Sequence, residues 1–188
     1  MAKLPGEERV PEFDERAVVE AARQGSQDAL AALYEYYFPK VYRYVALRLG
    51  PEDAEDVTTE VFLRIIDNIR SFTWRGLPFG AWVFRIARNE VVSHARKQKV
   101  RANTAQLHES IRDEGFNGFE RVETELTVAT IQRLAQALPE AQRQVIALRF
   151  GAGLSVAETA KALNKTENNV KVLQHKAIAR LQQLVKDQ

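Results

Sequence analysis

Amide and basic side chains gather in a helical pattern between residues 167 and 185. At about 100 degrees per residue, its apolar positions share one stripe, which we expect to face a core; they are Val170, Leu173, Ala177, Leu181 and Leu184. The opposite face carries side chains that bond base edges or phosphates. A solvated basic helix is the simpler alternative. The candidate DNA contacts are Asn168, Asn169, Lys171, Val172, His175, Lys176 and Arg180.

A second group combines aromatic rings with arginines between residues 72 and 88. Aromatic platforms beside cations bind unpaired strands, and stacking of one base contributes about 1–3 kcal/mol. The alternative is that the rings are core, which we favour for Phe79 and Trp82, whereas Phe72 and Trp74 lie in a loop and are better candidates. The expected single-strand site is Phe72, Trp74, Arg75, Arg85, Arg88, Asn89 and Arg96.

Three carboxylates, Asp53, Asp56 and Glu60, recur at helical spacing. They could meet one partner protein or one metal ion, and the metal is the weaker interpretation because no nearby histidine completes a ligand set. The sequence shows no Ser-His-Asp order, phosphate-binding glycine loop or nucleotide fingerprint. We therefore expect no cofactor and no enzymatic activity.

Composition and charge favour a cytoplasmic protein that binds nucleic acid. The 188 residues include no cysteine, which excludes disulfides and thiolate metal sites. No apolar run could span a membrane, and no leader pattern is present. Basic residues dominate 85–101 and 161–186, whereas acidic residues dominate 53–67 and 108–125. Separate basic stretches suit phosphates, and the acidic ones suit another partner.

The first half of the chain carries clear helix signals. Asp14 and Ser26 can each cap a helix start. Pro39 predicts a kink or a short break in a long helix. Gly50 and Pro51 end that helix and begin the next. The third helix should bury a wide apolar stripe, formed by Val57, Val61, Ile65 and Ile69 with Phe62 and Ile66 alongside.

Further along, a loop over 70–80 precedes a helix from Trp82 to about Lys97, on which His94 lies near the apolar side. In the C-terminal part, Ser155 and Glu158 form a capping box, followed by a three-residue turn and a helix from Glu167 to about Val185. These lengths are typical of a helix-turn-helix.

We therefore expect an all-α fold of two small helical domains joined by a flexible linker. The expected boundaries are a disordered N-terminus at 1–13, a first domain at 14–97, a linker at 98–126 and a helix-turn-helix domain at 127–188.

Three segments together resemble the extracytoplasmic-function (ECF) branch of bacterial sigma factors. The run DAEDVTTEVFLRIID at 53–67 is similar to the family segment that docks on RNA polymerase. The run FGAWVFRIARN at 79–89 resembles the segment that melts and reads the minus-10 element. The run LPEAQRQVIALRF at 138–150, with the GLS that follows at 153–155, resembles region four.

The resemblance implies a subunit that directs RNA polymerase to promoters. Region four would bind duplex DNA at the minus-35 element, and region two would hold melted minus-10 bases. Asp53, Asp56 and Glu60 would dock on the core enzyme. The implied partners are polymerase core, through its clamp helices and flap, promoter DNA in duplex and single-stranded form, and an anti-sigma factor, with no membrane insertion.

Two other functions stay open at this point. A free-standing regulator with a helix-turn-helix would need no polymerase, but it would have no use for a single-strand platform. A metal-dependent nuclease could use the carboxylates at 53, 56 and 60, and would require magnesium and turnover.

Overall fold

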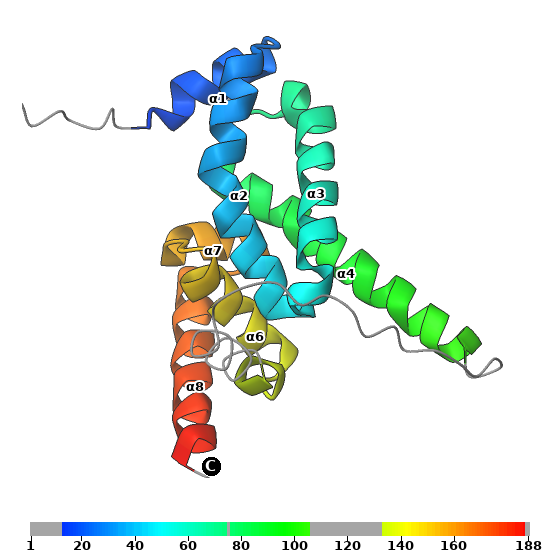
Figure 1. Cartoon of the computed structure of the whole chain (residues 1–188). Coiled ribbons are helices and arrows are strands. Elements are labelled where there is room, and N and C mark those ends of the chain that lie inside the picture. Colours follow the sequence, from blue (N-terminus) through cyan, green and yellow to red (C-terminus); the bar gives the residue numbers. More distant parts are fainter. Residues whose placement is uncertain (1–12, 75, 106–132, 187–188) are drawn as a thin grey trace, which may run out of the picture.

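The computed structural model describes residues 13–74, 76–105 and 133–186 (Figure 1). Within these ranges every regular element is a helix, which confirms the all-α fold. The first domain contains α1 (Glu15–Arg23), α2 (Gln27–Leu49), α3 (Pro51–Asn68), the short turn η1 (Ile69–Ser71) and α4 (Phe79–Ala105). The second contains α6 (Glu140–Ile146), the π-helical turn η2 (Ala147–Gly151), α7 (Val156–Leu163) and α8 (Glu167–Lys186).

The predicted helix starts in the first domain are confirmed. Asp14 and Ser26 accept hydrogen bonds from the backbone amides of Ala17 and Ala29, at 3.1 and 3.3 Å. Gly50 joins α2 to α3 with a φ of 111°, a left-handed conformation that favours glycine. These caps satisfy amides that a helix start leaves without an intrahelical partner.

The predicted interruption at Pro39 was wrong as a break, because α2 continues from 27 to 49 with Pro39 inside it. A proline removes one backbone hydrogen bond from a helix, a cost that tertiary packing can offset. Tyr37 and Val41 on either side are both buried, and α2 packs against α1, α3 and α4. Burial of this central helix on several sides holds it together.

The stripe on α3 forms the centre of the first domain. Val57, Val61, Ile65 and Ile69 are buried as expected, and so is Phe62. Ile66 departs from the expectation, since 47% of it is exposed. It lies one position beyond Ile65, and 100 degrees of rotation carries it past the edge of the stripe that packs on α2.

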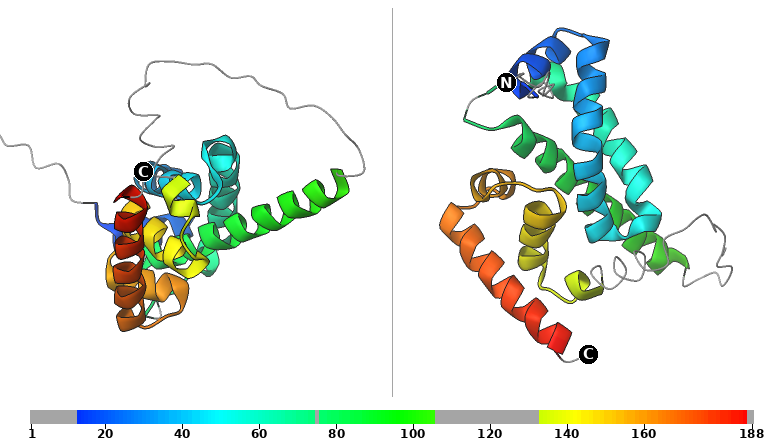
Figure 2. Two further views of the ribbon diagram at one scale, coloured as in Figure 1. Left: turned by 90° about the horizontal axis from the view of Figure 1, so that it is seen from below. Right: turned by 60° about the vertical axis from the view of Figure 1, so that its left-hand side comes forward.

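Helix α4 is longer than the sequence pattern indicated. It runs to Ala105, so residues 98–105 belong to a helix and not to a linker. This end has no apolar periodicity because it projects from the body of the molecule (Figures 1 and 2). The rest of the expected linker, and residues 1–12 of the expected disordered N-terminus, lie outside the described residues.

The second domain follows the expected helix-turn-helix plan. The capping box is complete: the Ser155 hydroxyl accepts from the Glu158 amide at 3.1 Å, and the Glu158 carboxylate accepts from the Ser155 amide at 2.8 Å. Asn164 ends α7 in the left-handed conformation and starts the turn into α8. A single cluster of buried side chains extends from the first domain into η2, α7 and α8. No described helix is both long and apolar enough to cross a membrane.

Candidate nucleic-acid interface

Helix α8 presents one buried face and one open face. Val170 and Ala177 are completely buried against the domain core, and Leu173, Leu181 and Leu184 are partly covered. The predicted apolar stripe therefore faces inward. Figure 2 shows α8 beside the shorter helices that carry it.

None of the residues that the structure describes covers the opposite face of α8. Every side chain that the sequence pointed to there is exposed, and none forms a hydrogen bond or ion pair with another described residue. Val172 is 45% exposed. This is the arrangement that a major-groove helix requires, because its first turns must reach base edges. The exposed set is Asn168, Asn169, Lys171, Val172, His175, Lys176 and Arg180.

The aromatic residues in and beside the loop differ in burial, because Phe72 and Phe79 are buried whereas Trp74 is partly exposed. Phe72 is 2% exposed and packs against Trp74, Phe79 and Trp82, with ring centroids 5.1 to 5.2 Å apart. Its placement among the base contacts is corrected: the rings around it leave no free face for stacking. Phe79 is fully buried, as we favoured. Trp74 is partly exposed with Arg16 over its ring, and Arg75 lies outside the described residues.

A cavity of about 310 Å³ opens beside this ring cluster, between α3 and α4. Trp82 and Ile86 supply apolar wall, and several polar groups surround them. Trp82 is only partly buried, so the expectation that it is core holds only in part. The polar lining residues are Arg64, Asn68, Ser71, Asn89 and Glu90. A mixed apolar and polar wall of this kind suits a flat heterocycle.

Sequence reasoning found Asn89 but missed the residues that α3 and η1 contribute to this cavity. Arg64 lies 3.4 Å from Glu90 of α4, Asn68 donates to the Arg64 carbonyl, and Ser71 donates to the Asn68 carbonyl. The available signal was the i, i+4 spacing of Arg64 and Asn68 at the end of an otherwise acidic face.

The arginines of α4 differ in their surroundings. Arg85 donates from Nε and Nη2 to the Lys161 carbonyl of α7, at 3.1 and 2.7 Å. Arg88 is partly buried near Tyr44. Burial raises the pKa of Tyr44 to about 12, although the positive charges of Arg48 and Arg88 act to lower it. Asn89 and Arg96 are exposed. The predicted minus-10 residues therefore do not form one continuous open surface.

The three carboxylates of α3 do not act together. The two oxygens of Asp53 face α4, at 3.1 Å from His94 Nε2 and 2.8 Å from Gln98 Nε2. This corrects the expectation that Asp53 belongs to the docking face, because it joins two helices instead. Asp56 and Glu60 are exposed and unpaired among the described residues.

One apolar residue missed by the sequence reasoning lies on the same face. Leu63 follows Glu60 by three positions and is 51% exposed. In the described part of the chain, no group of three or more His, Cys, Asp or Glu side chains is placed to hold a metal ion.

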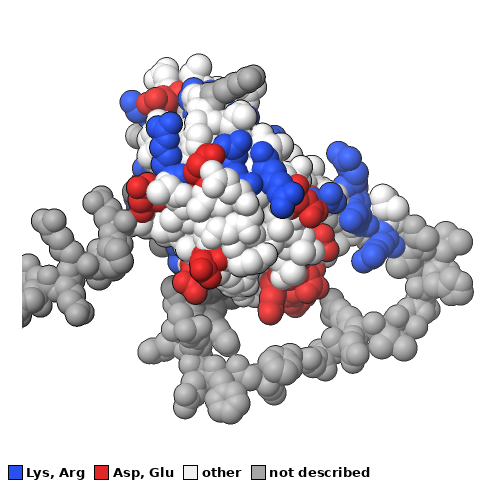
Figure 3. All heavy atoms as spheres, turned by 90° about the horizontal axis from the view of Figure 1, so that it is seen from above, with Lys and Arg blue, Asp and Glu red and all other residues white. Residues whose placement is uncertain are grey.

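Positive charge is concentrated on the projecting end of α4. Figure 3, seen from above, shows Lys and Arg side chains gathered where this helix leaves the body of the molecule. The exposed cations there are Arg96, Lys97, Lys99 and Arg101. Such a cluster attracts a phosphate backbone without regard to sequence.

Comparison with known families identifies both halves of the chain. Residues 33–101 match the model described as Sigma-70 region 2, and residues 134–183 match Sigma-70, region 4. The first match covers α3 and most of α2 and α4, and the second covers α6 to nearly the end of α8.

Curated relatives carry the same assignment. The ECF RNA polymerase sigma factor BldN of Streptomyces coelicolor is 37% identical over 90% of this chain, which spans 65% of that relative's length. SigD of Mycobacterium tuberculosis, also an ECF sigma factor, is 35% identical over 88% of this chain and 81% of its own length. SigW of Bacillus subtilis is 30% identical over 90% and 95%.

Two solved structures share the fold. One is CnrH in complex with the cytosolic domain of CnrY, with a TM-score of 0.72 and 22% identity over 92% of this chain and 97% of that one. The other is the sigma factor RpoE with the anti-sigma factor NepR from Bartonella quintana, with a TM-score of 0.67 and 23% identity over 86% and 98%.

Proposed function

Because this chain belongs to the ECF group of RNA polymerase sigma factors, we propose that it directs polymerase core to specific promoters through two different DNA surfaces. The observation that carries the proposal is the pairing, in one chain, of an open helix face on α8 with a polar, aromatic-walled cavity between α3 and α4. The first suits duplex DNA and the second an unstacked base. In this role the chain is a regulatory DNA-binding subunit rather than an enzyme, and it acts in the cytoplasm.

The minus-35 element would be read by the N-terminal half of α8. Asn168 and Lys171 are of the types that bond adenine and guanine edges in the major groove, and both are exposed. Lys176 and Arg180 lie further along the helix, where phosphates are the accessible groups. The capping box and the turn at Asn164 fix the angle at which α8 leaves α7.

The minus-10 element would be held as a single strand on the first domain. One base would enter the cavity against Trp82 and meet the amide of Asn89. Trp74 offers a second ring at the edge of the loop. Arg96, which is exposed on α4, would contact the phosphate backbone of the strand. The basic end of α4 adds attraction that does not depend on sequence.

Docking on polymerase would use the outer face of α3. Asp56, Glu60 and Leu63 recur at i, i+4 and i+7, so they form one row with charge at one end and an apolar anchor at the other. The clamp helices are the expected contact for this row, and the flap is the expected contact for the second domain. An anti-sigma factor is a further expected partner, because the RpoE relative is known in complex with one.

The test is reconstitution with a bacterial core polymerase and a promoter library. We expect the full chain to join the core and to start transcripts from a limited set of sequences that share two elements. Core alone should not do so. DNA binding without any affinity for core would support the free-standing regulator instead, and magnesium-dependent cleavage would support the nuclease.

A further inference from the structure

A hollow of about 430 Å³ lies between α1 and the loop that joins η1 to α4. Trp74 of the loop and Ala17 of α1 supply its apolar wall. The charged residues around it are Asp14, Arg16 and Glu20. The match to region 2 begins at residue 33, so it does not include α1 or its cap. The hollow therefore brings a ring of the aromatic loop together with a part of the chain that the family match does not describe.

The charged groups of this hollow differ in whether they already have partners. The Asp14 carboxylate caps α1 by accepting from the Ala17 amide at 3.1 Å. The Glu20 carboxylate is paired with Arg23 at 2.8 Å. Arg16 is exposed and forms no hydrogen bond or ion pair with any residue that the structure describes. Its five N–H donors are therefore available to a ligand, in contrast to the two carboxylates.

Arg16 stands above the indole of Trp74 at a distance close to what an inserted base requires. The Cζ atom of Arg16 lies 5.7 Å from the centroid of the ring. Stacked planes are about 3.4 Å apart, so a base between the guanidinium and the indole needs about 7 Å between them. An exposed arginine can give way by the remaining distance of roughly 1 Å through small rotations of its side chain. Both groups are planar and both stack on bases.

The hollow lies close to the cavity between α3 and α4, where we place one base of the melted strand. The centroid of the Phe72 ring is 5.1 Å from that of Trp74 and 5.2 Å from that of Trp82, which forms part of the cavity wall. The two tryptophans are consequently separated by no more than about three base steps of 3.4 Å. A strand with one base against Trp82 can therefore place a nearby base against Trp74.

We propose that Arg16 and Trp74 form a second subsite for unpaired DNA, in which a base is held between the guanidinium and the indole. The inference deepens the proposed function and rests on it, because the ligand is the same melted strand. Stacking on both faces does not depend on which base is present. This subsite stabilises the melted strand without reading its sequence, whereas Asn89 in the cavity can bond to a base edge.

The first test measures how the free chain binds a short single-stranded DNA of mixed sequence. The chain has two tryptophans, so Trp82→Phe leaves Trp74 as the fluorescent reporter. We expect the DNA to quench this fluorescence. In the same background, Arg16→Ala should raise the DNA concentration needed for half-maximal quenching by about fivefold, because one of the two stacking surfaces is lost. Arg16→Lys retains the charge without the planar group and should restore only part of the affinity.

The second test uses core polymerase and a premelted promoter fragment in which abasic sites replace the bases of the melted strand one at a time. With the parent chain, one of these sites should weaken binding because it empties the subsite at Trp74. Arg16→Ala should weaken binding of the intact fragment by about fivefold. At that one abasic position it should have little further effect, since the base and Arg16 take part in the same contact.

Arg101→Ala is the matched control, because it removes the same charge from an exposed position on the projecting end of α4. It should weaken all fragments by a similar factor, through loss of general attraction to phosphates, and it should not be coupled to any single base. Circular dichroism checks that each variant keeps its helices. If the alanine variant at position 16 loses them, the comparison of Arg16→Lys with the parent decides.

Two results would overturn the inference. One is quenching of Trp74 that is unchanged by the substitutions at Arg16. The other is a loss on Arg16→Ala that is the same for every abasic fragment, as expected for Arg101→Ala. Quenching that depends on Arg16, in a chain that does not bind core polymerase, would count against the proposed function and would still support the subsite.

Discussion

Single residues on α8 fall into two groups according to how far along the helix they lie. Lys171 sits in the first turns, opposite the buried Val170 and Ala177 stripe, where a major-groove helix meets base edges. Arg180 lies more than a turn beyond His175. At 1.5 Å per residue, the two cations are about 13 Å apart along the axis and cannot share the same bases.

Alanine substitutions at Lys171 and Arg180 should separate recognition of specific bases from general affinity for DNA. Lys171→Ala should relax preference at one or two minus-35 positions, since one good base contact discriminates by about 1–3 kcal/mol. Arg180→Ala should weaken binding to all sequences alike and reduce the salt slope by about 0.9, for one lost phosphate contact. Binding of both variants to a promoter-fragment library at two salt concentrations measures this. Uniform loss for Lys171→Ala and altered preference for Arg180→Ala would mean that α8 docks in a different rotation.

The two loop aromatics should also behave differently. Phe72 is buried among three rings, so Phe72→Ala should lower the free energy of unfolding by about 3–5 kcal/mol. Trp74 is at the rim, and Trp74→Ala should impair open-complex formation more than closed-complex binding, with a smaller stability change. Thermal unfolding and permanganate footprinting of melted bases test the pair. Equal loss of closed and open complexes would show that Trp74 is structural.

Charge reversal on α3 addresses polymerase docking. Asp56→Lys combined with Glu60→Lys should weaken core binding by roughly tenfold at low salt and by less at high salt, because exposed charges are screened. The control pair, Asp28→Lys with Glu35→Lys, makes the same change in charge on exposed α2 positions and should have little effect. Tight core binding by the α3 variant at moderate salt would remove α3 from the interface.

At the level of elements, local sequence signals predicted where helices start, whereas tertiary packing determines whether a helix continues past an unfavourable residue. Asp14, Ser26 and Ser155 could be identified from the sequence because a cap is a contact within three residues. A break at Pro39 could not be excluded from the sequence, because the packing that stabilises α2 through this position comes from other helices. Asp53 and Arg64 were missed in their true roles because their partners, His94 and Glu90, lie on another helix.

The capping box connects an element to its function. Ser155→Ala removes the hydroxyl that accepts from the Glu158 amide, and should cost about 1 kcal/mol of stability. Because α7 carries the turn into α8, the same variant should weaken minus-35 binding more than minus-10 melting. Ser155→Asp, which retains an acceptor, should recover most of both. A change in unfolding temperature without any change in minus-35 binding would show that α8 is positioned by other contacts.

For the whole molecule, segregated charge is what the sequence showed most directly, and the arrangement of domains is what it could not show. The basic end of α4 and the acidic face of α3 follow from composition along the chain. The contact between Arg48 of α2 and Glu140 of α6 does not, since the two residues are 92 positions apart and both are of types that usually lie on the surface. Only the packing of both domains into one cluster reveals that Arg48 is nearly buried.

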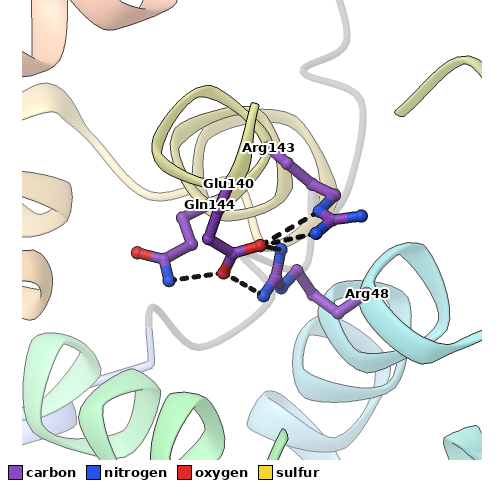
Figure 4. Close-up of polar contacts among 4 residues, drawn as sticks. All are labelled: Arg48, Glu140, Arg143 and Gln144. Carbon is purple, nitrogen blue, oxygen red and sulfur yellow. Dashed lines mark hydrogen bonds and ion pairs between the residues drawn. The ribbon is translucent and has the colours of Figure 1, made fainter. Parts of the chain in front are cut away.

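The contact between the two domains should depend on pH through Glu140, whose carboxylate oxygens accept hydrogen bonds from Arg48 at 2.5 and 3.1 Å (Figure 4). Partial burial opposes its ionisation, but hydrogen bonds from Arg48 and Arg143 outweigh this and lower its pKa from 4.5 to about 2. In an open state, in which the two domains have separated and Arg48 no longer contacts Glu140, the pKa of the carboxylate should lie near its ordinary value. Above that value Glu140 is ionised in both states, and its contact with Arg48 contributes its full stability. As the pH falls from about 4.5 toward 2, the open state takes up the proton first and is favoured.

The chain has no cysteine, so Glu35→Cys and Gln183→Cys can place fluorophores at exposed positions on α2 and α8. Energy transfer between them should fall as this labelled parent is acidified through the window, before helical circular dichroism is lost. Glu140→Gln cannot ionise, so its transfer should be lower at neutral pH and should change less with acid. Protonation of other carboxylates affects both chains alike, and the difference between the two titrations isolates Glu140. Superimposable titrations of parent and variant would show that the Arg48 contact does not control the separation of the domains.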